Sequence, residues 1–202
     1  MREAAARQTR EAIVAAAAEA FAVRGWSATT MREIAGAAGV SVKTVEAVYR
    51  TKAALLEVAV DFAIRGDVEP VQMPQREAVR RMEDAPDAAA MLRLHAAHLR
   101  SVNGRSAGIA RTVEQAAEAD EAVARLWRRM NENRRFAVSW AAKTLLAKPG
   151  RRRGLRRADV DTAFWVALDW GTYRTLTEHA GLTPAGFERW LVAYYRAQFL
   201  PL

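Results

Sequence analysis

Residues 31–48 contain two short helical patterns on either side of one glycine, and this arrangement constrains the fold more than any other segment. Thr30 is followed three residues later by Glu33, the pattern of a capping box at a helix start. Ala35 offers a small side chain where two helices can cross closely, and Gly39 suits a turn that needs a positive φ. This spacing is typical of a DNA-binding helix-turn-helix, whose second helix lies in the major groove. Val40 and Val45 would hold the second helix against the first, and Val48 is also apolar.

The composition favours an all-α fold. The 202 residues include only 6 prolines and 11 glycines, too few for a loop-rich β protein. Periodicity and caps predict about nine helices, arranged as an N-terminal three-helix helix-turn-helix domain (residues 1–66) and a larger helical bundle (residues 67–202). The segment from Gly66 to Pro86 contains three prolines, the last of them Pro86, and is predicted to be a connector with little regular structure. The helices expected in the first domain begin at Thr9, Thr30, Ser41 and Thr51, and those beyond it cover 86–102, 106–118, 120–148, 158–180 (bent near Gly171) and 183–200.

Charge and cysteine content limit the classes of function. A net charge of +8 favours a polyanionic partner. The absence of cysteine excludes thiolate catalysis and disulfides, and suits a reducing compartment. No stretch approaches the roughly 20 apolar residues of a membrane helix. We therefore expect a cytoplasmic protein with no membrane partner.

Together with its flanks, the helix-turn-helix segment resembles the TetR family of transcriptional regulators over residues 9–62. The resemblance implies a homodimer that binds a palindromic DNA operator and a C-terminal domain that binds a small-molecule effector. We expect a repressor that a hydrophobic effector releases from double-stranded DNA. A group within the family also has a C-terminal pattern similar to Thr183-Pro184 and Phe187–Leu191. The residues that carry the main resemblance are Thr9-Arg10-Glu11-Ala12-Ile13, Phe21, Gly25, Ala28-Thr29-Thr30, Ile34-Ala35, Ala38-Gly39-Val40-Ser41, Thr44, Lys52 and Leu55-Leu56.

The end of the second helix departs from the family. Members usually have Tyr at the position of Glu46 and Tyr or His at that of Val48, and both commonly hold phosphates. Here Glu46 would bring a negative charge to DNA and Val48 has no donor, so affinity should fall or the docking should shift. The residues predicted to contact DNA are Thr30, Arg32, Ser41, Val42, Lys43, Thr44, Glu46, Ala47, Val48 and Lys52.

Two further sets of residues are predicted in the C-terminal domain. Apolar side chains and two histidines form a candidate effector pocket, although each of them could equally be core. The aromatic stripes of 158–180 and 183–200 form a candidate dimer interface. The pocket set is Met91, His95, His98, Trp127, Met130, Trp140 and Trp165, and the interface set is Phe164, Leu168, Leu176, Phe187, Trp190, Leu191 and Tyr194.

Other readings of the sequence are weaker. His95 and His98 have a spacing that can bind a metal, but no third ligand is evident, so we expect no metal and no cofactor. The basic run Arg151–Arg157 is either a solvated loop or a second nucleic-acid contact. No catalytic motif or catalytic residue is identified, so an all-α enzyme is not expected. The alternative function is a helical small-molecule-binding protein whose DNA binding is weakened or lost.

Overall fold

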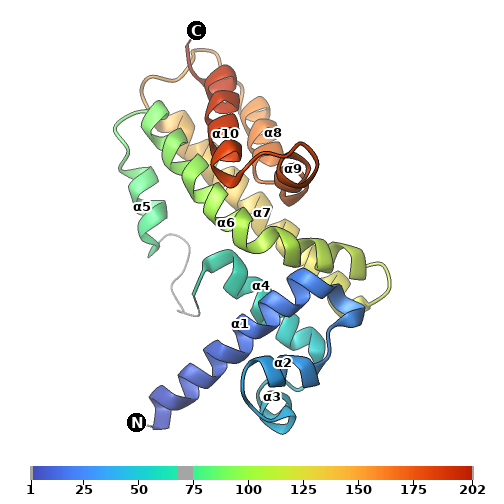
Figure 1. Cartoon of the computed structure of the whole chain (residues 1–202). Helices are drawn as coiled ribbons and strands as arrows, with labels where there is room; N and C mark the ends of the chain where they lie inside the picture. The colour runs from blue at the N-terminus through green and yellow to red at the C-terminus, as the bar shows by residue number, and fades with distance from the viewer. Residues whose placement is uncertain (1, 68–74, 202) are drawn as a thin grey trace. The chain divides into compact units, whose positions relative to one another are not determined.

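The protein is described by a computed structural model over residues 2–67 and 75–201, and all regular structure in these residues is helical (Figure 1). This confirms the expected all-α class. No helix in these two ranges has the length and apolar character that a membrane span requires. The helices are α1 (Arg2–Ala28), α2 (Met31–Ala37), α3 (Val42–Tyr49), α4 (Lys52–Arg65), α5 (Glu77–Glu83), α6 (Ala88–Ala116), α7 (Glu121–Ala147), α8 (Arg157–Ala167), α9 (Trp170–Arg174), the π-helical turn η2 (Thr175–His179) and α10 (Pro184–Phe199).

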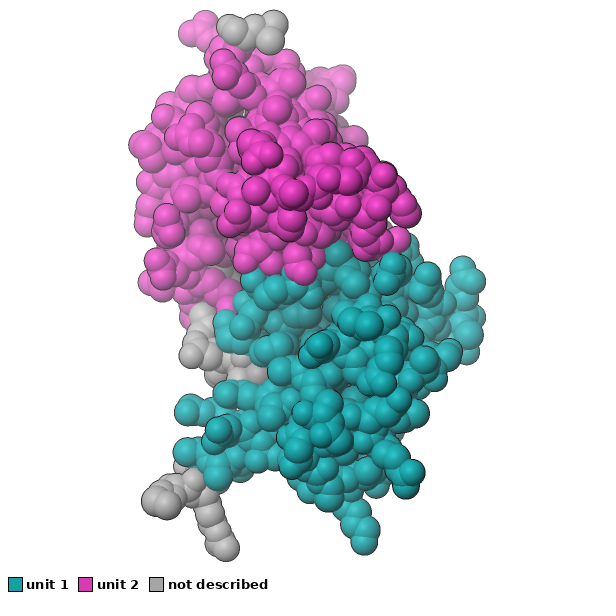
Figure 2. Space-filling model, viewed as in Figure 1, with its two compact units in different colours: residues 1–68, 105–129 teal, residues 69–104, 130–202 magenta. Residues whose placement is uncertain are grey.

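The chain forms two compact units (Figure 2). Unit 1 comprises residues 1–68 and 105–129, and unit 2 comprises residues 69–104 and 130–202. Helices α6 and α7 therefore each contribute to both units. The division at residue 66 into a DNA-binding and a regulatory domain stays a prediction, since compactness alone does not assign a role to residues 105–129.

Unit 1 is built on apolar faces of α1 and α4, with α2 and α3 packed beside them. Phe21 is fully buried and stacks on Trp26 with ring centroids 5.9 Å apart. Helix α6 approaches α1 closely at Gly108, where an added Cβ would lie 3.1 Å from Cβ of Ala22. Its neighbour Thr112 is buried and donates a hydrogen bond to the carbonyl oxygen of Phe21 (2.7 Å). The rest of the buried apolar side chains include Ile13, Val14, Ala17, Ile34, Val45, Leu55, Leu56, Ala59, Val60 and Ile109.

Helix α4 is held by the parts of α6 and α7 that belong to unit 1. Arg105 on α6 donates hydrogen bonds to the carbonyl oxygens of Ala63 and Ile64 at the end of α4, and both donor–acceptor distances are 3.1 Å. Arg129 on α7 forms an ion pair with Glu57 on α4. The two hydrogen bonds from Arg105 satisfy carbonyls that a helix end leaves without intrahelical partners.

Unit 2 has an aromatic core formed by α6, α8 and α10. Phe164 lies 5.1 Å from Phe199 and 5.5 Å from Tyr195, measured between ring centroids. His95 of α6 meets Phe164 edge-on at 5.2 Å. All four side chains are at most 3% exposed, so they form the interior of this unit.

Several predicted caps are confirmed. The hydroxyl of Thr51 accepts a hydrogen bond from the amide of Ala54 (3.1 Å), and α4 ends at Gly66 with φ 87°. Asp120 caps α7 through the amides of Ala122 and Val123. Thr183 caps α10, which has a proline in its first turn. These local signals need only neighbouring residues, which explains why the sequence reveals them.

Three predicted boundaries are wrong. Helix α1 begins at Arg2 because residues 2–8 are strong helix formers, and Thr9, the predicted cap, instead donates to the carbonyl of Ala5 four residues earlier (2.9 Å). The predicted connector contains α5; its residues Pro70 and Pro74 lie outside the described ranges. The predicted bend at Gly171 lies earlier, where the side chain of Asp169 caps α9 (2.8 Å to the amide of Thr172).

The predicted break at Asn103-Gly104 is also wrong, because α6 runs unbroken through both residues. Glycine and asparagine together cost a helix only about 1–2 kcal/mol. Burial of the flanking Leu99, Ala107 and Ile109 offsets that cost. Asn103 itself is 2% exposed, so the segment is part of the interior rather than a surface turn.

Candidate DNA-binding surface

Helix α2 begins with the predicted capping box. The amide of Glu33 donates to the hydroxyl of Thr30 (3.2 Å), and the amide of Thr30 donates to the carboxylate of Glu33 (2.9 Å). The hydrogen bonds from the backbone and side chain of Thr30 lower the pKa of Glu33, and the charge of Arg24 lowers it further. Arg24 pairs with Glu33 at 2.9 Å. The start of α2 is thereby fixed to the end of α1.

The turn between α2 and α3 follows the predicted geometry. Gly39 has φ 69°, and the amide of Val40 donates to the carbonyl oxygen of Ala35 (3.0 Å). Ala35 is 1% exposed, which fits a small residue at the helix crossing. Ser41 then caps α3 by accepting from the amide of Thr44 (3.1 Å), and the two hydroxyl oxygens lie 2.8 Å apart.

Helix α3 presents most of its surface outward. Val45 is its one buried residue, and it anchors the helix to the core of unit 1. Lys43, Glu46 and Ala47 are exposed, and Val48 is 42% exposed although it is apolar. A helix this short gains little stability from such a face. The face is therefore available to a partner, as a recognition helix requires.

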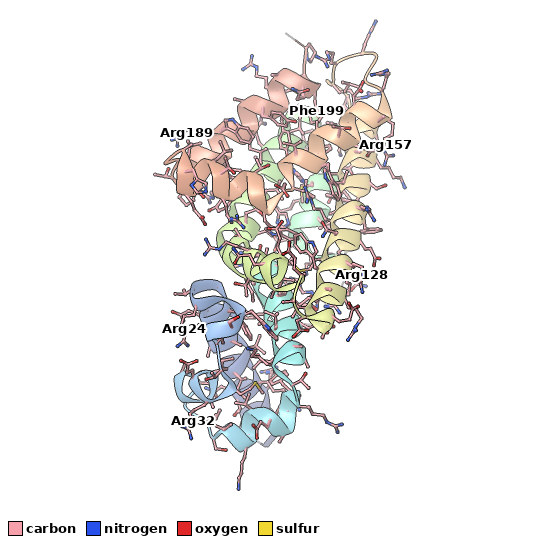
Figure 3. All side chains as sticks on the ribbon, turned by 90° about the vertical axis from the view of Figure 1, so that its right-hand side faces the viewer. Arg24, Arg32, Arg128, Arg157, Arg189 and Phe199 are labelled. Carbon is pink, nitrogen blue, oxygen red and sulfur yellow. The ribbon has the colours of Figure 1, made fainter. Side chains whose placement is uncertain are left out.

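Helices α2 and α3 each carry one cationic side chain on their surface. Arg32 on α2 and Lys43 on α3 are exposed, and neither has an ion-pair partner within residues 2–67 and 75–201. In Figure 3, Arg24 and Arg32 lie on the outside of the unit 1 helices. Thr30, Ser41 and Thr44 are committed to capping, and Val42 is half-buried. Arg32 and Lys43 are thus the predicted contacts whose charge remains free for phosphate or base edges.

Lys52 has a structural role that the sequence did not reveal. Its ammonium donates to the carbonyl oxygens of Trp26 (2.8 Å) and Thr29 (3.2 Å) and lies 4.1 Å from the Trp26 ring centroid. Burial lowers the pKa of Lys52, and the charge of Asp120 opposes this shift. Two of the three ammonium protons are therefore used within unit 1. The prediction that Lys52 contacts phosphate is revised: it positions the α1–α2 turn.

Arg50, which the prediction omitted, adds an exposed charge at the end of α3. It is the one non-glycine residue of the described ranges with a positive φ (50°), and the amide of Thr51 donates to the carbonyl oxygen of Tyr49 across it. Such backbone strain costs about 1–3 kcal/mol and clusters at functional sites. Its charge was visible in the sequence, but only the turn geometry brings it to the end of the recognition helix.

Residues 13–59, which include this surface, match the tetR family of bacterial regulatory proteins. This match confirms the predicted resemblance to the TetR family over the helix-turn-helix. The chain is accordingly a DNA-binding regulator of transcription with a helix-turn-helix. No curated protein sequence matches the chain significantly.

Solved structures of the same fold match nearly the whole length of this chain. A TetR-family regulator from Rhodococcus sp. has a TM-score of 0.68 at 18% identity, with 95% of this chain and 98% of that chain covered. A transcriptional regulator from Saccharomonospora viridis in complex with choline has a TM-score of 0.70 at 15% identity, and both chains are covered completely. NalD of Pseudomonas aeruginosa, the secondary repressor of the MexAB-OprM efflux pump, has a TM-score of 0.66 at 21% identity over 95% of this chain and 96% of that one. At these identities the likeness shows the fold.

The residues predicted to line an effector pocket are mostly engaged with their own chain. Trp127 belongs to unit 1, whereas the other six belong to unit 2. Met91 and Met130 are buried, and His98 is half-buried. The indole of Trp140 donates to Glu83 (2.9 Å), and the guanidinium of Arg134 lies 4.0 Å from the ring centroid of Trp165. Their assignment to a pocket stays a prediction.

His95 is 3% exposed, and its Nδ1 lies 2.7 Å from the hydroxyl oxygen of Tyr195. Burial, together with the smaller effect of the charge of His98, lowers the pKa of His95 to about 3. Desolvation raises the pKa of Tyr195 well above its usual range. The described residues contain no cluster of three or more His, Asp or Glu side chains that could hold a metal.

The predicted dimer interface needs correction. Phe164, Phe187 and Leu191 are 0% exposed, so their side chains belong to the core of their own chain and cannot meet a partner. Leu168, at 9% exposed, is nearly as buried. Periodicity identifies an apolar face but cannot say whether the same chain or another covers it. Leu176, Trp190 and Tyr194 are half-buried and stay candidates for the interface.

Proposed function

We propose that this regulator is a homodimeric repressor that acts in the cytoplasm by binding rather than catalysis, and that a small hydrophobic effector releases it from a palindromic operator. Residues 1–66 would bind DNA, and residues 67–202 would bind the effector and the partner subunit. The observation that carries the proposal is the outward face of α3, a helix whose one buried residue is Val45 and which bears the unpaired charge of Lys43.

Base recognition would come from the exposed face of α3. Lys43 lies in the first turn of α3, where a recognition helix reaches base edges, and can donate to guanine O6 or N7. Ala47 and Val48 offer apolar contacts suited to thymine methyl groups. Arg32 and Arg50 would add phosphate contacts from α2 and from the end of α3.

A dimer would use the outer faces of α8 and α10. Two recognition helices related by a two-fold axis read half-sites about 34–36 Å apart, so the operator should be palindromic. Trp190 and Tyr194 stack on one another with centroids 5.4 Å apart and remain partly exposed along α10. Aromatic side chains that are partly exposed in this way are enriched at protein interfaces.

The effector would act through α4. Helices α6 and α7 are each continuous from unit 2 into unit 1, where Arg105 and Arg129 hold α4. A ligand that shifts either helix would thereby change the position of α4 and, with it, α3. A coupling of about 1–3 kcal/mol would change operator affinity roughly 5- to 150-fold. The choline bound to the Saccharomonospora viridis protein supports small-molecule binding by this fold.

Selection of bound duplexes from random DNA by the full-length chain tests the proposal. We expect an inverted repeat, bound with two chains per duplex in sedimentation equilibrium. Enrichment of an asymmetric site, or one chain per duplex, would contradict the homodimeric repressor.

The second candidate is a small-molecule-binding protein with weakened DNA binding. It is favoured by Glu46, which is exposed on α3 and would bring a negative charge toward phosphates. For this candidate, the same selection would enrich no sequence above the starting pool, whereas effector binding would persist.

A further inference from the structure

A surface pocket of about 410 Å³ lies in unit 2, where α6 begins and α10 ends. Helices α6 and α10 form two of its walls, and the turn after α7, which contains Gly150, forms the third. That turn is fixed at both sides: the amide of Ala88 donates to the carbonyl of Pro149 (2.9 Å), and the amide of Arg152 donates to the carbonyl of Phe199 (2.7 Å). Figure 1 shows the start of α6 and the end of α10 side by side near the C-terminus. The walls are therefore formed before any ligand arrives.

The two helices line the pocket with the same spacing. Helix α6 contributes residues 89, 92 and 93, and α10 contributes residues 192, 195 and 196, so each supplies one face at i, i+3 and i+4. The inner side is apolar, with Leu92, Val192 and Leu200. Tyr195 adds its ring, since its hydroxyl is already paired with His95. The interior thus suits a hydrocarbon body.

The charged residues of the pocket favour an anion. Each helix ends its pattern with an arginine, Arg93 on α6 and Arg196 on α10. Both are exposed, and neither guanidinium has a hydrogen-bond or ion-pair partner in residues 2–67 and 75–201. The single lining carboxylate, Asp87, accepts the amide of Ala90 (2.7 Å) as a helix cap. Two guanidiniums facing one carboxylate leave a net positive charge.

We propose that this pocket binds a small organic carboxylate, with its apolar body against Leu92 and Val192 and its carboxylate paired to Arg93 and Arg196. Guanidinium groups match carboxylates with paired hydrogen bonds. A volume of about 410 Å³ is within the range of small-molecule sites. None of the residues predicted from the sequence to form an effector pocket lines this one. Binding here does not depend on the proposed repressor function, so either can fail without the other.

Isothermal titration calorimetry of the full-length chain with octanoate tests the proposal. Octanol has the same chain without charge, and inorganic phosphate has charge without an apolar body. We expect octanoate to bind at least tenfold more tightly than either control, because each lacks one half of the recognition.

Substitutions locate the site. The double variant Arg93→Gln/Arg196→Gln should weaken octanoate binding about tenfold or more while the melting temperature stays unchanged, because both side chains are exposed. Arg189→Gln is the matched control: this exposed arginine is on α10, outside the pocket (Figure 3), and its loss should leave binding unchanged. Ala89→Phe should also reduce binding by filling the space. Absence of octanoate binding, or equal affinity in the double variant and the wild type, would overturn the proposal.

Discussion

The ammonium of Lys52 lies 4.1 Å from the centroid of the Trp26 ring and donates a hydrogen bond to the carbonyl oxygen of Trp26 (2.8 Å). The two residues belong to α4 and to the last turn of α1. The ammonium also donates to the carbonyl oxygen of Thr29 (3.2 Å), in the turn that precedes the helix-turn-helix. One positive charge thus links α4 to the last turn of α1 and to the turn before α2, whereas the charge of Lys43 remains free on α3.

Lys52→Gln should lower the free energy of unfolding by about 1–3 kcal/mol, since a charged donor and a cation–π contact are lost. Urea denaturation followed by far-UV circular dichroism measures the change. The matched control is Lys43→Gln, which should change stability by less than about 0.5 kcal/mol because Lys43 is exposed. Equal stability of the two variants would contradict the structural role of Lys52.

Lys43→Ala should weaken binding to the selected operator by about 1–3 kcal/mol without changing the melting temperature. Fluorescence anisotropy with a labelled duplex at several salt concentrations measures the effect. If Lys43 contacts a base, discrimination between operator and scrambled DNA should shrink. If it contacts only phosphate, binding to both should weaken equally and the salt dependence should decrease by about one ion. Unchanged affinity would remove Lys43 from the interface.

Glu46→Tyr should strengthen operator binding and steepen its salt dependence, because it removes an exposed negative charge from α3 and adds a phosphate donor. Glu46→Gln separates these two effects, since it removes only the charge. The same anisotropy titrations apply. A loss of affinity in both variants would instead indicate that Glu46 accepts a hydrogen bond from a cytosine amino group.

Acidification should destabilise the fold through His95. Its pKa of about 3 in the folded chain lies below the ordinary value of 6.5, so the unfolded chain takes up a proton first as pH falls. This contribution to stability is fully present above pH 6.5 and declines from there down to about pH 3. At pH 5 the loss should be about 2 kcal/mol relative to pH 7.

His95→Gln should remove that part of the pH dependence while keeping a hydrogen-bonding group beside Tyr195. Urea denaturation of wild type and variant at pH 7 and pH 5 gives the difference. His179→Gln is the control, because His179 is exposed. An identical pH dependence in wild type and His95→Gln would show that His95 is not held neutral.

Ala193→Arg should dissociate the proposed dimer. This exposed residue lies between Trp190 and Tyr194 on α10, so an arginine there would bring charge into the interface without disturbing the core. Sedimentation equilibrium should then give the mass of one chain. Ala185→Arg, at an exposed position on the side of the same helix opposite Trp190 and Tyr194, should leave the dimer intact. A point substitution is needed because removal of α8–α10 would also remove Phe164 and Phe187 from the core.

Local chemistry in the sequence determined the helix-turn-helix. The Thr30–Glu33 box, the Gly39 turn and the Ser41 cap each depend on residues at most five positions apart, so their types and spacing suffice to predict them. The same holds for the caps at Thr51, Asp120 and Thr183.

Tertiary structure decided what the long side chains contact and which apolar faces are covered. Lys52 and Lys43 are both lysines near helix starts, and only the position of Trp26 separates a structural cation from a free one. Phe187 and Trp190 occupy one helix, yet the first is fully buried and the second partly exposed. The sequence determined the helices and the recognition motif because those energies are local. Burial and ion pairing depend on neighbours distant along the chain, so the structure alone assigned them.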